Sequence, residues 1–325
     1  MRLIGFLLSV FFLSLSSITV VFANDYPNKP IKIIDPYPPG GSTDIAARLV
    51  AESISNQLGQ TVIVENKPGA SGSIGTQYVA RQAADGYTFM IGTDPTHGTN
   101  KLLIPDQRFD PLEDFTPLGL LALNPILLVV NPAVEADTLE EYLALVDAGV
   151  IEGSFGSSGL GSPHHLAGEL LSKYSGVSLV HIPYRGGVPA TNDLLGNQIP
   201  AAFVSVITAL PHLQSGKLKA LAVTDEQRYE ALPDVPTIGE TFEGFSVPSW
   251  LAFFAPKDLS EPEGGLLIGA IQNAIHDPKI KQHLLESGLV VPEDTSPEAL
   301  SALQQSDFEA KRQIIVESGL NAVEP

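Results

Sequence analysis

Short apolar runs alternate along this chain with longer segments of helical period, and this alternation constrains the fold more than any other feature. The run 30–34 has the composition of a strand, and the segment 43–58 repeats apolar residues at helical spacing until Gly59. A strand-like run at 61–65, a helical segment at 74–84 and a strand-like run at 87–92 follow. This β-α-β-α-β order predicts a parallel sheet with helices on its faces.

A second unit of the same kind lies in the middle of the chain. Its expected strands and helices alternate over 153–157, 163–174, 179–183, 188–195 and 201–206, with one more strand over 218–224. The apolar segments 118–130 and 249–255 flank this unit, and we interpret them as crossings between two lobes. We expect the later helical segments, 264–275, 279–287 and 297–318, to return to the first lobe.

The length of the chain, 325 residues, also favours two folding units. One hydrophobic core rarely serves more than about 300 residues. We therefore predict an α/β protein in which the first lobe comprises 24–121 and 250–325 and the second comprises 122–249.

The first 23 residues have the composition of a secretion signal peptide. Arg2 gives a positive start, residues 3–22 are mostly apolar, and Ala23 ends the predicted cleavage site. A retained membrane anchor is the alternative, because the apolar stretch is nearly long enough to span a bilayer. We favour cleavage after Ala23, since a single Arg is a weak flank and polar residues follow at once.

Composition and missing motifs argue against several classes of function. The chain has no cysteine, which excludes disulfides, thiolate metal ligands and cysteine nucleophiles. Its formal net charge of −19 argues against nucleic-acid binding, because phosphates need a basic surface. The usual serine-hydrolase and nucleotide-binding motifs are absent. His164 and His165 are adjacent and lack further ligands, so we predict no metal site and no cofactor.

Two glycine-rich loops are the strongest candidates for a binding site. The first, 36–44, joins a strand to a helix, and the second, 156–163, has the same position in the second unit. Exposed amides and the positive end of a helix dipole hold an anion without Lys or Arg. We expect Ser42 or Thr43 to cap the first helix, and Pro163 to lie in the first turn of the second. Ordinary, well-capped turns are the alternative interpretation.

Three further residues have open roles. His97 follows the third strand and can reach a ligand or belong to a capped turn. Arg185 follows another strand end and can pair with a second carboxylate or stay exposed. Trp250 can pack in the core or line the cleft.

Several segments of this chain resemble the Bug, or TctC-type, substrate-binding proteins of tripartite tricarboxylate transporters. The matching segments are 29–44, 64–70, 84–88, 156–157, 165–169, 181–186, 209–212, 216–224 and 232–237. Each motif is weak alone, but together they cover nearly all of the chain after the signal peptide, in the order of the family.

The resemblance implies a two-lobed periplasmic binding protein fold, with a mainly parallel sheet and flanking helices in each lobe and the ligand in the cleft between them. It implies a small organic carboxylate as ligand, held largely by main-chain amides of the two loops, while Asp44 braces its loop. It also implies delivery to a membrane permease with a large and a small subunit. The residues expected at the ligand are Tyr37, Pro39, Gly40, Gly41, Ser42, Thr43, Thr93, His97, Ser157, Ser158, Gly161, Ser162, His164, Arg185, Gly186 and Ser205.

The chain departs from the family pattern at three places. Pro38 stands where a small residue is usual and should stiffen its loop. His164 stands where Ser or Thr commonly precedes a single His. Val204 and Ser205 follow Phe203, where many members have Asp. If that Asp recognises an amino or hydroxyl group, its loss disfavours amino acids. The expected ligand is therefore a di- or tricarboxylate, or an aromatic or apolar monocarboxylate.

We weigh three functions: a carrier-type binding protein, a hydrolase or isomerase on a similar scaffold, and a sensor lobe that presents its ligand to a membrane kinase. The missing catalytic motifs and the resemblance favour a monomeric, non-enzymatic binding protein of the periplasm, which can also serve a sensor kinase.

Overall fold

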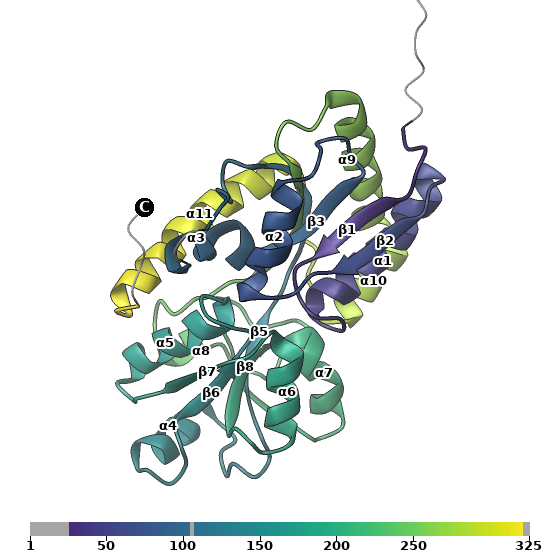
Figure 1. The fold of residues 1–325 in the computed structure, drawn as a ribbon. Helices are drawn as coiled ribbons and strands as arrows, with labels where there is room; N and C mark the ends of the chain where they lie inside the picture. The colour runs from purple at the N-terminus through teal and green to yellow at the C-terminus, as the bar shows by residue number, and fades with distance from the viewer. Residues whose placement is uncertain (1–25, 105–106, 321–325) are drawn as a thin grey trace, which may run out of the picture.

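The computed structural model describes residues 26–104 and 107–320, which form two α/β lobes joined by two crossings of the chain (Figure 1). The predicted signal peptide, 1–23, lies outside the described residues. In the described parts of the chain, no helix is both long and apolar enough to cross a membrane. The two α/β units expected from the sequence are confirmed.

The first lobe contains a five-stranded sheet in the order β2-β1-β3-β10-β4. Its strands are β1 (Ile31–Asp35), β2 (Val62–Asn66), β3 (Thr88–Thr93), β4 (Phe115–Leu123) and β10 (Trp250–Pro256). Strand β1 pairs in parallel with β2 and β3, so that Ile33 lies opposite both Val64 and Phe89. Strand β10 runs antiparallel to its two neighbours. The predicted mainly parallel sheet is therefore present.

Helices pack on both faces of this sheet. They are α1 (Ser42–Leu58), α2 (Ser73–Ala80), α3 (Asn100–Leu103), α9 (Glu261–His276) and α10 (Pro278–Glu286), with single turns η1 (Ala70–Gly72) and η2 (Pro95–Thr99). Helix α2 ends four residues before the predicted limit at residue 84. The amide of Arg81 closes the helix on Tyr78 and Val79, and the Asp85 side chain accepts from Tyr87 N in a turn that starts β3.

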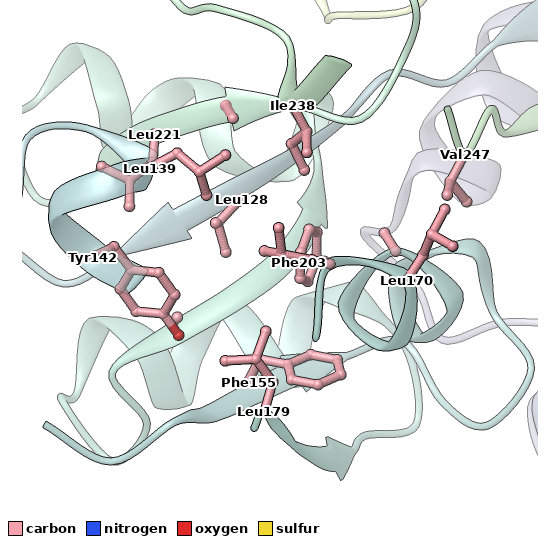
Figure 2. Close-up of a cluster of buried hydrophobic side chains, with 14 of the residues drawn as sticks. Leu128, Leu139, Tyr142, Phe155, Leu170, Leu179, Phe203, Leu221, Ile238 and Val247 are labelled. Atoms are coloured by element: carbon pink, nitrogen blue, oxygen red, sulfur yellow. The ribbon is translucent and has the colours of Figure 1, made fainter. Parts of the chain in front are cut away.

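The second lobe contains a sheet in the order β7-β6-β8-β5-β9, in which only β5 runs against its neighbours. Its elements are β5 (Ile126–Val130), α4 (Leu139–Asp147), β6 (Ser154–Ser157), α5 (Pro163–Ser175), β7 (Val180–Pro183), α6 (Gly187–Leu195), β8 (Ala201–Ser205), α7 (Val206–Gln214), β9 (Lys219–Val223) and α8 (Ile238–Thr241). Phe155 and Phe203 pack edge to face in its core, 5.6 Å between centroids (Figure 2).

The chain crosses between the lobes at two adjacent points. The apolar segment 118–130 forms not one strand but two, because Asn124 and Pro125 separate β4 in the first sheet from β5 in the second. The return crossing ends at Ser249, just before β10. The Asn124 amide donates to Ser249 O at 2.9 Å, which joins the two crossings. The exact lobe boundaries given above stay a prediction.

The last helix, α11 (Pro297–Glu317), belongs to both lobes. Leu300, near its start, packs in a core cluster of the first lobe with Trp250 and Phe254. Ile315, near its end, is fully buried in the core of the second lobe. Figure 1 shows this helix passing from one lobe to the other along one side of the molecule. The expectation that the C-terminal helices cover the first lobe holds for α9 and α10 and is incomplete for α11.

Two helical glycines allow a matched test of the packing. A Cβ at Gly168 in α5 would overlap the ring of Phe155, whereas a Cβ at the exposed Gly265 in α9 would meet nothing. Gly168→Ala should lower the free energy of unfolding by about 1–3 kcal/mol through overpacking. Gly265→Ala should raise it by about 0.5–1 kcal/mol, because Ala has less backbone entropy to lose. Urea unfolding followed by circular dichroism measures both; equal effects would contradict the described packing.

Candidate functional site

A cavity lies between the lobes, with an empty volume of about 560 Å³ that includes solvent at its mouth. That size suits a small organic molecule. The first lobe contributes Tyr37, Pro38, Gly41, Ser42, Thr43, Thr93, Asp94, Pro95 and Leu251, the crossings contribute Asn124 and Ser249, and the second lobe contributes Ser158, Pro163, His164, Gly186, Gly187, Val188, Pro189, Ser205 and Thr208. The cavity therefore contains nine of the sixteen residues expected at the ligand.

Helices α1 and α6 begin at this cavity from opposite lobes. The N-cap of α1 is Gly41 and that of α6 is Gly186, and neither has a side-chain capping bond. The first amides of a helix have no acceptor within the helix and bear the positive end of its dipole. The prediction that Ser42 or Thr43 caps α1 is wrong, because Ser42 is already the first helical residue. An oxygen of a ligand can therefore take the place of a cap at both helices.

Helices α5 and α7 also begin at the cavity, but one amide in the first turn of each already has an acceptor. Ser162 Oγ accepts from His165 N at 3.2 Å, and Pro163 lies in the first turn of α5, as predicted. Val206 N, at the start of α7, donates to Pro125 O at 2.9 Å. Helices α1 and α6 are therefore the two at the cavity whose N-caps are glycines, which offer no side-chain acceptor to the first amides.

The loop before α1 is braced from within. Asp44 Oδ2 accepts from Gly40 N at 3.0 Å, while its Oδ1 accepts from Arg48 Nη2 at 2.8 Å and from Asn66 Nδ2 at 3.0 Å. Burial disfavours the charged form of Asp44, but these hydrogen bonds together have the larger effect, so that the pKa of the carboxyl group is lowered. Asp44 therefore braces its loop, as the resemblance implied. Gly40 gives its amide to this brace, and neither Gly40 nor Pro39 lines the cavity.

Most of the second loop also serves its own structure. Ser157 Oγ lies 2.6 Å from His181 Nε2 and accepts from Gly159 N at 3.0 Å. Gly161 N donates to His165 Nδ1 at 3.1 Å. Ser157, Gly161 and Ser162 do not line the cavity, whereas Ser158 does.

His164 joins two cavity serines. Its Nδ1 lies 2.8 Å from Ser158 Oγ, and its Nε2 lies 3.2 Å from Ser205 Oγ. Burial lowers the pKa of His164 to about 3, so the imidazole is neutral at neutral pH. A neutral ring donates at one nitrogen and accepts at the other. Among the described residues, no group of three His, Asp or Glu side chains is placed to hold a metal ion.

Three side chains that the sequence analysis considered for the ligand site lie away from the cavity. His97 is fully buried in the first lobe, stacked on Phe254 with centroids 3.7 Å apart, since η2 turns its ring inward. Val204 is fully buried in the second core, so its replacement of an Asp does not shape the cavity wall directly. Trp250 packs in the core and donates from Nε1 to Asp307 Oδ2 at 3.0 Å.

Arg185 lies outside this cavity. It is exposed and lines a second hollow that shares Tyr37, Pro38 and Ser158 with the first. Thr93, by contrast, lines the main cavity, and its Oγ1 lies 3.0 Å from Tyr37 Oη. The expected ligand residues therefore divide between the main cavity, its neighbouring hollow and the structure of the two loops, apart from His97, which packs in the core.

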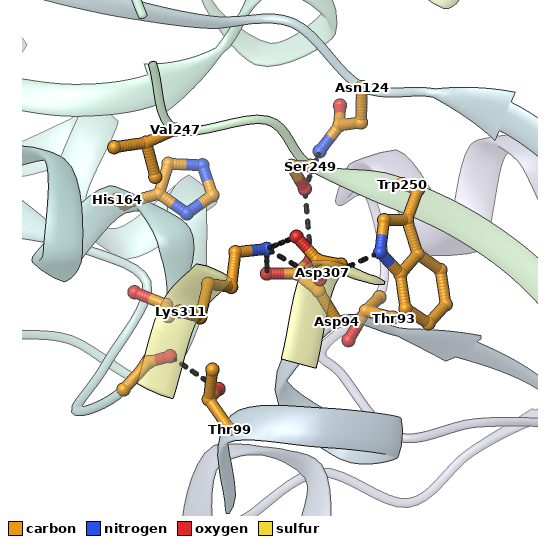
Figure 3. Close-up of polar contacts among 12 residues, drawn as sticks. Thr93, Asp94, Thr99, Asn124, His164, Val247, Ser249, Trp250, Asp307 and Lys311 are labelled. Carbon is orange, nitrogen blue, oxygen red and sulfur yellow. Dashed lines mark hydrogen bonds and ion pairs between the residues drawn. The ribbon is translucent and has the colours of Figure 1, made fainter. Parts of the chain in front are cut away.

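Sequence reasoning missed the floor of the cavity, which Asp94, Asn124 and Ser249 form. Ser249 Oγ donates to Asp94 Oδ1 at 3.1 Å, and the buried Lys311 of α11 lies 2.6 Å from Asp94 Oδ2 (Figure 3). Burial raises the pKa of Asp94 to about 6, although the Lys311 charge opposes this. The available signal was a polar residue in each apolar crossing segment, with Asn124 inside 118–130 and Ser249 at the start of 249–255.

The lobes also touch directly beside the two loops. Ser71 Oγ donates to Leu160 O at 2.9 Å, and Thr99 Oγ1 donates to Gly161 O at 2.8 Å. At Gly186, an added Cβ would lie 3.2 Å from Pro38 of the other lobe. The two lobes are therefore in direct contact beside the cavity.

Comparison with known proteins places this geometry in a family. A family model described as the tripartite tricarboxylate transporter family receptor, TctC, matches residues 46–320. The structure of the periplasmic binding protein BugD is 34% identical, with a TM-score of 0.86 over 91% of this chain and 99% of that chain. Such similarity over most of the chain confirms the predicted periplasmic binding protein fold.

Two of the similar structures were solved with a carboxylate ligand. A protein of R. palustris solved with adipate is 30% identical, with a TM-score of 0.86 over 91% of this chain and 99% of its own. The protein MatC from Rhodopseudomonas palustris, solved with bound malate, is 30% identical, with a TM-score of 0.84 over 89% of this chain and 100% of its own. Both ligands are dicarboxylates.

The burial of His97 has a consequence for stability in acid. Burial lowers the pKa of His97 from 6.5 to about 3, so between these values the unfolded chain binds a proton that the folded chain does not. His97 therefore contributes stability above pH 6.5 that is lost as the pH falls towards 3. Between pH 7.5 and 5.0 the free energy of unfolding of the wild type should fall by about 2 kcal/mol more than that of His97→Gln. Urea unfolding at both values tests this; parallel losses would contradict it.

Proposed function

This chain belongs to the tripartite tricarboxylate transporter family of receptors, and we propose that it captures a small organic carboxylate between its lobes and delivers it to a membrane permease. One observation carries the proposal: α1 and α6 begin at the same cavity from opposite lobes, and neither N-cap supplies a side-chain bond. A carboxylate has two oxygens, so it can accept from both helices at once.

The electrostatics of the cavity suit an anion held without a cation. Asp94 is the only charged side chain among the described lining residues, and Lys311 lies against it. Each helix N-terminus is equivalent to about half a positive charge. Two such ends replace the hydrogen bonds to water that the carboxylate loses on binding. The amides that would donate are those of Ser42 and Thr43 in α1 and of Gly187 and Val188 in α6.

Binding and closure are linked in this proposal. Because the ligand contacts both lobes, it stabilises the closed form relative to an open one. Pro38 and Gly186 face each other where the lobes meet, so the stiff Pro38 loop would form part of the closing edge. A permease that recognises the closed form would then distinguish loaded from empty protein.

The remaining parts of the proposal concern place and ligand. We propose a periplasmic protein, exported by cleavage after Ala23, whose partner is a permease with a large and a small subunit. The adipate and malate bound to its relatives support a dicarboxylate. Arg185, in the neighbouring hollow, is proposed to meet the far carboxylate of a longer acid. The roles of a sensor kinase and of a monomeric state stay predictions.

A thermal-shift panel with residues 24–325 tests the function. Succinate, malate, citrate, adipate and benzoate are suitable probes. An acid present at one hundred times its Kd stabilises the folded state by about 2.7 kcal/mol, which raises the melting temperature by several degrees. A panel in which no acid shifts the melting temperature would contradict the proposal.

Gly41→Val tests the site itself. Gly41 has φ −78°, and a Cβ there would meet nothing closer than Pro38 O at 3.6 Å, so the variant should fold. Its branched side chain would cover the first amides of α1 and should weaken binding by about a hundredfold, roughly 2.7 kcal/mol. The melting temperature without ligand is the control for folding. An unchanged shift with ligand would remove this loop from the site.

A further inference from the structure

We infer that the cavity prefers carboxylates that bear a hydroxyl group, with Asn124 Oδ1 as the acceptor for that hydroxyl; this inference rests on the proposed function. Asn124 lines the cavity at the crossing between β4 and β5 and is 3% exposed. Its Oδ1 is buried and has no hydrogen-bond partner among the described residues. A buried carbonyl oxygen without a donor costs free energy, and a donor on the ligand would remove that cost.

The orientation of the Asn124 amide follows from the ion pair beneath it. Lys311 Nζ lies 2.6 Å from Asp94 Oδ2, which keeps this carboxylate an acceptor. Ser249 Oγ, 3.1 Å from Asp94 Oδ1, must therefore give its single proton to Asp94 (Figure 3). Its lone pairs remain for Asn124 Nδ2 at 3.5 Å, so the nitrogen and not the oxygen of Asn124 faces this serine.

A second serine supports the same orientation. Asn124 Nδ2 also donates to Ser205 Oγ at 2.9 Å. Both protons of the amide thus have serine acceptors, and a flipped amide would place Oδ1 against Ser249, whose proton is already used. Oδ1 is consequently the atom left for the ligand.

The serines around His164 add a donor to this acceptor. If Nδ1 of the neutral ring bears the proton, Nδ1 donates to Ser158 Oγ and Nε2 accepts from Ser205. The hydroxyl proton of Ser158 is then free to donate into the cavity. If Nε2 bears the proton, the Ser205 proton is free instead. In both tautomers one serine donates to the cavity while Asn124 accepts. A ligand with a carboxylate and a hydroxyl matches both groups.

An ammonium group fits this pattern less well than a hydroxyl group. It brings three protons and a charge, and it needs several acceptors or a carboxylate in contact. The carboxylate among the described lining residues is Asp94, whose oxygens are taken by Ser249 and Lys311. Asn124 Oδ1 offers one acceptor, which matches the single proton of a hydroxyl group.

Pairs of acids that differ only by a hydroxyl group test the inference. Calorimetry with residues 24–325 would compare L- and D-malate with succinate, and L- and D-lactate with propionate. In the wild type, at least one hydroxy acid should bind about tenfold or more tightly than its parent acid, because the parent leaves Oδ1 without a donor. Asn124→Ala should reduce this ratio to about one, since the acceptor is gone.

Two further variants make the test specific. Ser158→Ala should weaken both acids of a pair by a similar factor and keep their ratio, because it removes one of the two serines that can donate to a carboxylate in the cavity. Ser249→Ala removes the group that orients the amide and should lower the ratio several-fold. It replaces Asn124→Ala as the test if that variant does not fold.

The outcomes separate this inference from the proposed function. Succinate and propionate binding as tightly as every hydroxy acid, an unchanged ratio in the Asn124 variant, or aspartate binding more tightly than malate would each overturn the hydroxyl preference. In all three cases carboxylate binding itself would stand. Failure of every acid to bind would instead overturn the proposed function, and the inference with it.

Discussion

The open amides at the starts of α1 and α6 set the requirements that the rest of the structure meets. Glycine stands at both N-caps, so no side chain blocks the approach of a ligand oxygen. Because Asp44 accepts from the amide of Gly40 and pairs with Arg48, these two charges in the first turns of α1 neutralise each other. The helix ends then act in a cavity without a free cation among its described residues, where dipoles are screened less than in water.

The floor of the cavity, formed by Asp94, Asn124 and Ser249, joins the two lobes and presents polar groups to the cavity. Asn124 and Ser249 lie on the two crossings, and α11 brings Lys311 to Asp94 beneath them. The ends of α11 pack in different lobes, so this helix and the crossings together fix the relation of the two cores. A buried ion pair adds little stability by itself. Here it determines which way Ser249 and Asn124 direct their hydrogen bonds.

The sequence predicted those features that depend on local pattern. The strand and helix order of both lobes follows from hydrophobic period, and the two loops follow from glycine between a strand and a helix. Features that depend on tertiary contacts were missed or wrong. Gly41 rather than Ser42 caps α1, and α2 ends where its last amides close on Tyr78 and Val79. His97 packs on Phe254, which no spacing in the sequence indicates. Asp94 and Asn124 reach the cavity only because segments distant in sequence meet there.

Amide proton shifts in nitrogen-15-labelled protein test the central claim most directly. A binding acid such as malate should move the amide resonances of Ser42, Thr43, Gly187 and Val188 downfield, with the largest changes at these residues, because their N–H groups donate to the carboxylate. Unchanged amides at both helix starts, with the largest shifts at the Arg185 side chain, would contradict the account.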